Sequence, residues 1–177
     1  MAKKKTKRST KKTASQATQN KNQKIVDNLV VSYWMEIETV QNYLANSQNL
    51  DGVRAMEIKE SLEQDIQEEL GHAQQIAARI NVLGGTVPGS MKFKAEQKSL
   101  QPPKDSTDVV SVIKGVIEAE DGAINQYQKI IDMCDGVDYA TQDMVIALMA
   151  DEQEHRRDFV GFLMEYDKSA ARKYRPS

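Results

Sequence analysis

Hydrophobic residues recur at alternating steps of three and four along four long stretches of the chain. This spacing is that of one face of an α-helix. The four stretches predict helices at about residues 24–47, 52–83, 107–135 and 139–167. The stripe of the first helix, for example, runs through Leu29, Tyr33, Glu36, Val40 and Tyr43. The chain is therefore expected to be all-α.

The connections between the predicted helices differ in length, which indicates the relative directions of the helices. Short turns at Asp51-Gly52 and at Gly136 make the first and second helices, and the third and fourth, antiparallel hairpins. Residues 84–106 instead hold three glycines and three prolines and show no helical period. A connection of this length suits a crossover that makes the second and third helices parallel. We expect an antiparallel four-helix bundle with one long crossover.

Residues 1–23 lack the hydrophobic pattern and consist mainly of Lys, Thr, Ser, Gln and Asn. We expect them to form a disordered basic arm, separate from a bundle domain at 24–177. Residues 1–24 carry nine basic side chains and no acidic one, which leaves 15 basic against 26 acidic residues in the rest. Such an arm indicates a polyanion partner, although arms of this kind can also be merely solubilising. The expected contacts with DNA, without sequence preference, are Lys3, Lys4, Lys5, Lys7, Arg8, Lys11 and Lys12.

One glutamate interrupts each of the four apolar stripes near its middle. These residues are Glu36, Glu69, Glu120 and Glu152. Burying four unpaired carboxylates would cost several kcal/mol each, and their charges would repel one another. Either cations offset this charge or the carboxylates protonate. A pair of metal ions would offset it directly, and carboxylate oxygens suit iron and manganese.

The two histidines of the chain strengthen the prediction of a metal site. His72 and His155 each follow one of the inward glutamates by three residues, which places both side chains on one helix face. A tyrosine also follows the first glutamate of each half by seven residues, at Tyr43 and Tyr127. The halves therefore repeat each other, and two lone glutamates with two Glu-x-x-His pairs form a di-iron carboxylate arrangement.

With these motifs, residues 25–167 resemble the ferritin-like superfamily, specifically the bacterioferritins and bacterioferritin-like mini-ferritins. The resemblance rests on Glu36…Tyr43, Glu68-Glu69-Leu70-Gly71-His72-Ala73, Glu120…Tyr127 and Asp151-Glu152-Gln153-Glu154-His155. It implies that Glu69 and Glu152 bridge two metal ions and that the six ligands are also the catalytic residues. Of the other ligands, Glu36 and His72 would complete one site, and Glu120 and His155 the second. Glu68 and Asp151 would orient the opposite histidine, with Tyr43 and Tyr127 near the metal carboxylates.

The resemblance also implies two iron ions per subunit, with manganese or zinc as substitutes, and a homo-oligomeric, dodecameric shell. Leu70 stands where bacterioferritins place the methionine that binds haem, so no haem is expected. Gln101 and Gly122 stand where related mini-ferritins often carry two cysteines, so no thiol chemistry is expected. The first helix has no histidine, so the inter-subunit site of Dps-type mini-ferritins is not expected either.

The function implied is that of a ferroxidase mini-ferritin that oxidises Fe(II) with peroxide or oxygen, stores ferric iron and protects DNA. Two alternatives remain open. One is a nucleoid-type DNA-binding protein in which the metal has a minor role. The other is a non-storage di-metal enzyme such as a manganese catalase. The single cysteine, Cys134, and the lack of any long apolar run indicate a cytoplasmic protein, with nucleoid association if the arm binds DNA.

Overall fold

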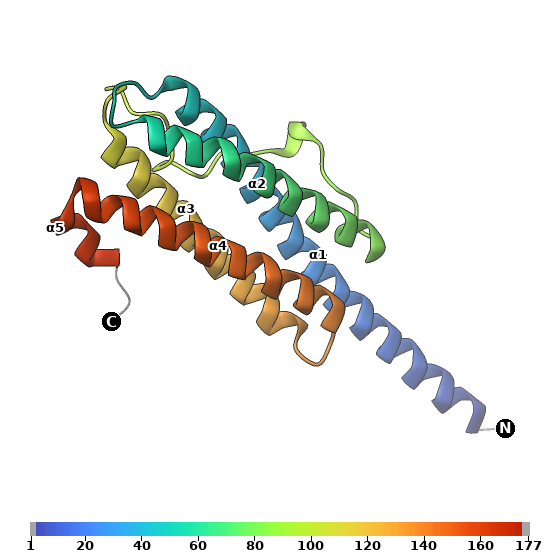
Figure 1. Cartoon of the computed structure of the whole chain (residues 1–177). Helices are drawn as coiled ribbons and strands as arrows, with labels where there is room; N and C mark the ends of the chain where they lie inside the picture. Colours follow the sequence, from blue (N-terminus) through green and yellow to red (C-terminus); the bar gives the residue numbers. More distant parts are fainter. Residues whose placement is uncertain (1–2, 175–177) are drawn as a thin grey trace.

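The computed structural model is a bundle of four long helices and describes residues 3–174, with side chains described from Lys21 onward (Figure 1). The long helices are α1 (Lys3–Asn49), α2 (Met56–Val82), α3 (Val109–Cys134) and α4 (Tyr139–Tyr166). Three short elements are η1 (Ser90–Lys92), α5 (Lys168–Ala171) and η2 (Arg172–Tyr174). Over residues 3–174 there is no strand, and no described helix is long and apolar enough to cross a membrane. The all-α fold class is confirmed.

The helices are connected as the sequence predicts. α1 and α2 form one hairpin, α3 and α4 form the other, and residues 83–108 return along the bundle between them (Figure 1). α2 and α3 therefore point the same way, so the single long crossover is confirmed. The crossover packs closely on α3, because a Cβ placed on Gly115 would lie only 2.4 Å from the Ser99 carbonyl oxygen.

Local chemistry explains where the helices of the second hairpin begin. The side chain of Asp108 accepts a hydrogen bond from the Ser111 amide at 3.1 Å, and that of Asp138 accepts one from the Thr141 amide at 3.1 Å. Both contacts cap otherwise unpaired amides of a first helical turn. The turn between α3 and α4 contains Gly136 at a φ of 65°, a conformation that costs glycine little. Residues of the hairpin itself therefore account for the start of each helix and for the turn between them.

The helix α1 differs from the prediction at its N-terminal end. Its backbone is helical from Lys3, whereas the sequence predicts disorder over 1–23 and a helix from about residue 24. This part of α1 projects beyond the bundle (Figure 1). A helix nucleated by packed residues extends at little cost, and Lys, Gln and Ala are good helix formers. The side chains of Lys3 through Lys12 lie outside the described residues, so the DNA contacts and the division at residue 24 stay predictions.

Two apolar clusters fill the interior, one toward each end of the bundle. One cluster includes Leu62, Ile113 and Phe159, and the other includes Leu29 and Ile76. Between them lies a layer of buried polar side chains contributed by all four long helices. The apolar clusters exclude water from this layer, so its charges interact through a medium of low polarity.

Candidate metal centre

The polar layer brings together all six ligands that the sequence predicts. α1 supplies Glu36 and α3 supplies Glu120, while α2 and α4 each supply a Glu-x-x-His pair. The six side chains are buried, with at most 8% of any residue exposed. Their ligand atoms form two groups, each with all atoms within 4.8 Å of one another: Glu36, Glu69, His72 and Glu152; and Glu69, Glu120, Glu152 and His155.

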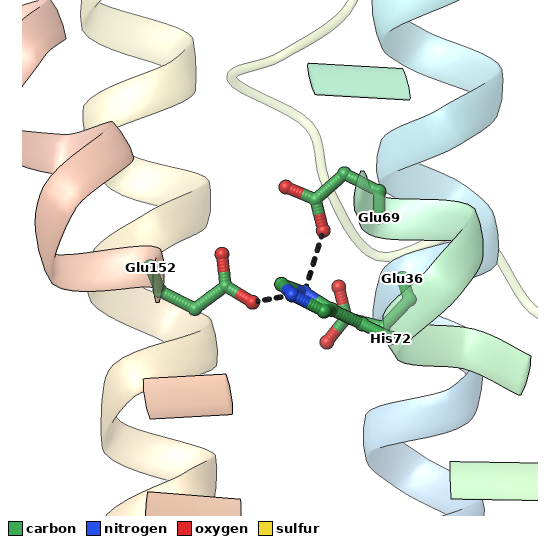
Figure 2. A group of neighbouring side chains, drawn as sticks. All are labelled: Glu36, Glu69, His72 and Glu152. Carbon is green, nitrogen blue, oxygen red and sulfur yellow. Dashed lines mark ion pairs between the residues drawn. The ribbon is translucent and has the colours of Figure 1, made fainter. Parts of the chain in front are cut away.

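Glu69 and Glu152 belong to both groups and lie between the two histidines. The Nδ1 atom of His72 is 3.0 Å from Glu152 Oε1 and 3.6 Å from Glu69 Oε2 (Figure 2). The Nδ1 atom of His155 is 3.3 Å from Glu69 Oε1 and 3.4 Å from Glu152 Oε2. Each of the two carboxylates therefore turns one oxygen toward each histidine. This is the placement that a carboxylate bridging two ions requires.

The innermost donor atoms of the centre have no hydrogen-bond partner among the described residues. They are both carboxylate oxygens of Glu69 and of Glu152, and Nδ1 of both histidines. The nitrogen–oxygen distances are short, but the atoms converge on shared space and do not form well-directed hydrogen bonds. Buried polar atoms without partners are rare in native proteins, and a bound ion is one way to satisfy them. Carboxylate and imidazole donors together fit iron or manganese.

The outer nitrogen of each histidine contacts a carboxylate from the opposite hairpin. Nε2 of His155 lies 2.9 Å from Glu68 Oε2, and Nε2 of His72 lies 3.3 Å from Asp151 Oδ2. A carboxylate at this position favours the tautomer in which Nε2 carries the hydrogen and Nδ1 is free to bind a metal. Glu68 and Asp151 therefore lie where the sequence places them.

The two predicted tyrosines also contact the centre, and each crosses to the other hairpin. Tyr43 of α1 donates its hydroxyl hydrogen to Glu120 of α3, and Tyr127 of α3 donates to Glu36 of α1. Both tyrosines are fully buried. Burial and the neighbouring carboxylates raise the pKa of both hydroxyls well above the usual value, so the hydroxyls remain donors.

The carboxylates of the centre differ in their pKa values. Burial, and then the charges of Glu69 and Glu152, raise the pKa of Glu36 and of Glu120 well above the usual value. Burial alone would also raise the pKa of Glu69, but His155 and His72 outweigh it and lower that pKa to about 2.

The histidines show the opposite effect. Burial alone would lower their pKa values, but Glu152 and Glu69 outweigh it and raise the pKa of His72 to about 10 and that of His155 to about 12. Without metal, the site therefore holds protons at neutral pH, and an entering cation must displace them.

The sequence pattern predicted the buried face of α1 wrongly at two positions. Tyr33 and Val40 are only half-buried, whereas Ser32 and Thr39 are 1% and 6% exposed. Thr39 is covered by the crossover, because its hydroxyl oxygen accepts a hydrogen bond from Gln97 Nε2 at 2.7 Å. The prediction was wrong because it followed apolar residues, and the buried positions here are polar. Glu36 and Tyr43 were assigned correctly, since both are buried.

A second polar face of α1, not recognised in the sequence, holds the crossover. Glu38 accepts hydrogen bonds from the backbone amides of Glu96 and Gln97 at 2.8 and 2.9 Å. One and two turns further along, Asn42 contacts the Gln97 side chain and Asn46 donates to the Leu100 carbonyl at 2.8 Å. The recurrence of polar residues at steps of four was the available signal for this face. These contacts hold the crossover against α1, the helix that carries Glu36.

Comparison with known proteins agrees with this geometry. The protein is 27% identical over 140 residues to the DNA protection during starvation protein of Pyrococcus furiosus, a match that covers 77% of this chain and 75% of that protein. It is 28% identical over 134 residues to the bacterial ferritin of Neisseria meningitidis serogroup B, covering 75% and 81%. The dodecameric thioferritin of Bacteroides fragilis, a bacterioferritin-related protein, superposes with a TM-score of 0.69 at 25% identity, covering 90% and 96% of the two chains.

A family model also matches most of the chain. The model of the ferritin-like domain, Ferritin, matches residues 26–168. This range contains α2, α3, α4, the part of α1 from Val26 onward, and every residue of the centre. The expected resemblance is thereby confirmed, and the chain belongs to the ferritin family.

Proposed function

We propose that this protein binds two iron ions at the centre and oxidises Fe(II) to Fe(III), which it then stores. The observation that carries the proposal is the set of buried donor atoms on Glu69, Glu152, His72 and His155 that have no hydrogen-bond partner. Four inward carboxylates are costly in a dry interior, and two cations offset them directly. Membership of the ferritin family supports iron as the metal.

Different residues of the centre contribute to different parts of the proposed oxidation of iron. Each Fe(II) gives up one electron, and peroxide takes up two electrons and two protons to form two water molecules; oxygen is the alternative oxidant. Carboxylates stabilise the higher charge of Fe(III), so Glu69 and Glu152, shared by both positions, favour the product of oxidation. Tyr43 and Tyr127 hold one oxygen of Glu120 and of Glu36, which leaves the other oxygen of each free for metal.

The proposal is tested by adding Fe(II) anaerobically to purified protein and then mixing with oxygen or peroxide. Replacing Glu36 or Glu120 by alanine should slow formation of the ferric product by orders of magnitude, because each change removes a ligand of one position. Glu118→Gln is the matched control, since Glu118 lies on α3 near Glu120 but is exposed.

The proposal fails if both alanine variants oxidise iron at the rate of the parent protein. Circular dichroism on the same samples would show that the helices persist. If the manganese-loaded protein evolves oxygen from peroxide and no iron mineral forms, the protein is a manganese catalase and not a ferritin in function.

We further propose that the protein assembles into a dodecameric shell. The relative from Bacteroides fragilis is a dodecamer, and the alignment covers 90% of this chain. A closed shell provides an interior in which ferric mineral can collect. Light scattering combined with size-exclusion chromatography gives the subunit number directly, and a monomer would contradict both the shell and storage.

DNA protection is a second candidate function. It is favoured by the basic composition of residues 1–24 and by the likeness to the DNA protection during starvation protein. Changing the seven basic residues between Lys3 and Lys12 to glutamine should weaken binding of duplex DNA in gel shifts. Iron oxidation should be unchanged, and binding by the parent should weaken steeply with salt. If the substituted protein binds DNA as tightly as the parent, the arm is only solubilising.

A further inference from the structure

A surface hollow lies between α1, the crossover and α3. Its volume is about 550 Å³, and ligand pockets in proteins commonly enclose about 300–1,000 Å³. None of the residues that line the hollow belongs to the metal centre. Two of them are sequence neighbours of its ligands, because Met35 precedes Glu36 and Ala119 precedes Glu120. The hollow is therefore a second cavity, close to the level of the centre but separate from it.

Four half-buried residues make part of the lining apolar. They are Trp34 and Met35 of α1 and Ala119 and Gly122 of α3. The indole of Trp34 packs against the ring of Phe93 in the crossover, with 5.2 Å between the ring centroids. This contact holds the indole in place, so the hollow has an aromatic wall on which a planar ring can pack.

The absence of a side chain at Gly122 keeps the hollow open on the side of α3. A Cβ added there would have Met35 Cε as its nearest neighbour, at 3.5 Å, which is an ordinary contact distance. The packing of α3 therefore does not require glycine at this position, although glycine destabilises the interior of a helix. A larger side chain at residue 122 would extend into the hollow and fill it.

The exposed part of the lining carries an excess of unpaired positive charge. Three lysines of the crossover contribute to it: Lys92, Lys94 and Lys98. Among the side chains that the structure describes, none is an ion-pair or hydrogen-bond partner of these three ammonium groups. Two unpaired carboxylates, those of Glu96 and Glu118, also line the hollow. The carboxylate of Glu38 lies there too, but it accepts hydrogen bonds from two backbone amides of the crossover.

We propose that this hollow binds an aromatic phosphate, a molecule of mononucleotide size that has a planar ring system and a phosphate group. The ring packs on Trp34 and Met35, and the phosphate lies among the three lysines. Lysine binds phosphate as a compact charge on a flexible stem, so three unpaired lysines along one segment suit this group. The inference does not depend on the proposed function, because the metal ligands take no part in it.

Equilibrium dialysis of the full-length protein tests the proposal with riboflavin 5′-phosphate and with adenosine 5′-phosphate. At least one of the two should bind, with one molecule per chain. The ring of the bound molecule should also change the fluorescence of Trp34, the single tryptophan of the chain. The parent compound without phosphate, riboflavin or adenosine, should bind about tenfold more weakly, because it lacks the charge that the lysines attract.

Filling the hollow tests its location. Gly122→Leu should abolish binding of the phosphate. Gly161→Leu is the matched control, because it makes the same change in the interior of α4, at another glycine where a Cβ has room. Circular dichroism would show that both variants fold. If Gly122→Leu does not fold, the lysine variants and the comparison with the phosphate-free compound decide.

Changes of charge at the hollow should act in opposite directions. Lys94→Gln and Lys98→Gln should each weaken binding of the phosphate about fivefold and leave binding of the phosphate-free compound unchanged. Glu118→Gln should strengthen binding, because it removes one of the two unpaired carboxylates. Lys104→Gln is the matched control, since Lys104 is an exposed lysine of the same crossover outside the hollow.

Three results would overturn the proposal. The first is that neither phosphate binds at millimolar concentration. The second is that a folded Gly122→Leu variant binds as tightly as the parent, which would place the ligand elsewhere. The third is an equal loss of affinity in Lys104→Gln and Lys98→Gln, which would mean that the charge of the whole surface attracts the phosphate and that the hollow does not.

Discussion

The two hairpins of the bundle present the same ligands but differ at several positions around them. Each hairpin contributes one lone glutamate, one Glu-x-x-His pair and one tyrosine at matching positions. The surrounding positions diverge: Glu38 and Asn46, which hold the crossover, have Gly122 and Ile130 as their counterparts on α3. The second hairpin instead has an ion pair between Asp121 of α3 and Arg156 of α4. The repeat is thus maintained at the positions that would bind a pair of ions and is lost at the surrounding positions.

The largest expected effect comes from a residue that serves both halves. Glu152→Gln removes a carboxylate shared by the two proposed metal positions, so both should weaken together. We expect oxidation of Fe(II) to slow by about a thousandfold, equivalent to about 4 kcal/mol of activation free energy. Stopped-flow absorbance of the ferric product measures this. Glu36→Gln, which affects one position, should cost less, and equal losses in the two variants would show that the shared residue has no special role.

The stability of the metal-free protein should depend on pH, because both halves of the centre hold protons. Glu36, Glu120 and both histidines have raised pKa values, so above about pH 6.5 the folded, metal-free protein binds more protons than the unfolded chain. Stability must then decrease as pH rises. Each proton of difference contributes about 1.4 kcal/mol per pH unit.

Thermal unfolding of the metal-free protein measured between pH 6 and pH 9 tests this sign. The melting temperature should fall across the range, and it should fall less steeply in Glu36→Gln and in Glu120→Gln. Saturating metal should remove most of the slope, because the ions replace the protons. A melting temperature that rises with pH would contradict the proposed charge distribution.

The smallest expected effect concerns the polar face that only α1 possesses. Glu38→Gln leaves the crossover amides of Glu96 and Gln97 with a weaker, neutral acceptor. We expect a loss of about 1–2 kcal/mol in the free energy of unfolding, measured with urea, and little change in iron oxidation. Gln41→Glu, at an exposed position on the same helix, is a control for surface charge on α1. A large loss of oxidation in Glu38→Gln would mean that the crossover also shapes the centre.

The sequence was sufficient for the four helices, their directions and the six converging side chains, because all of these follow from local periodicity and loop length. It was insufficient where contacts join distant segments. The start of α2 at Met56 and not near residue 52 is one case: the preceding turn is tied to the crossover by a backbone hydrogen bond from Asp51 to Ser106 at 2.8 Å. No pattern in the sequence near residue 52 indicates that this turn contacts residue 106.

The centre itself shows the same division. Its ligands were predictable because glutamates interrupt apolar stripes, but the buried Ser32 and Thr39 were missed because a buried polar residue gives no apolar signal. The Asp121–Arg156 pair joins residues on different helices, and many acidic and basic residues could have formed such a pair. Periodicity reveals which face of a helix is inward, but the choice among partners depends on the packed structure.

The crossed tyrosines make the two hairpins mutually dependent. The lone glutamate of each hairpin accepts a hydrogen bond from a tyrosine of the other, since Tyr43 donates to Glu120 and Tyr127 donates to Glu36. An isolated or misdocked hairpin thus carries an incomplete constellation and should not retain iron. Under the proposed function, retention of iron would therefore depend on the docking of both hairpins.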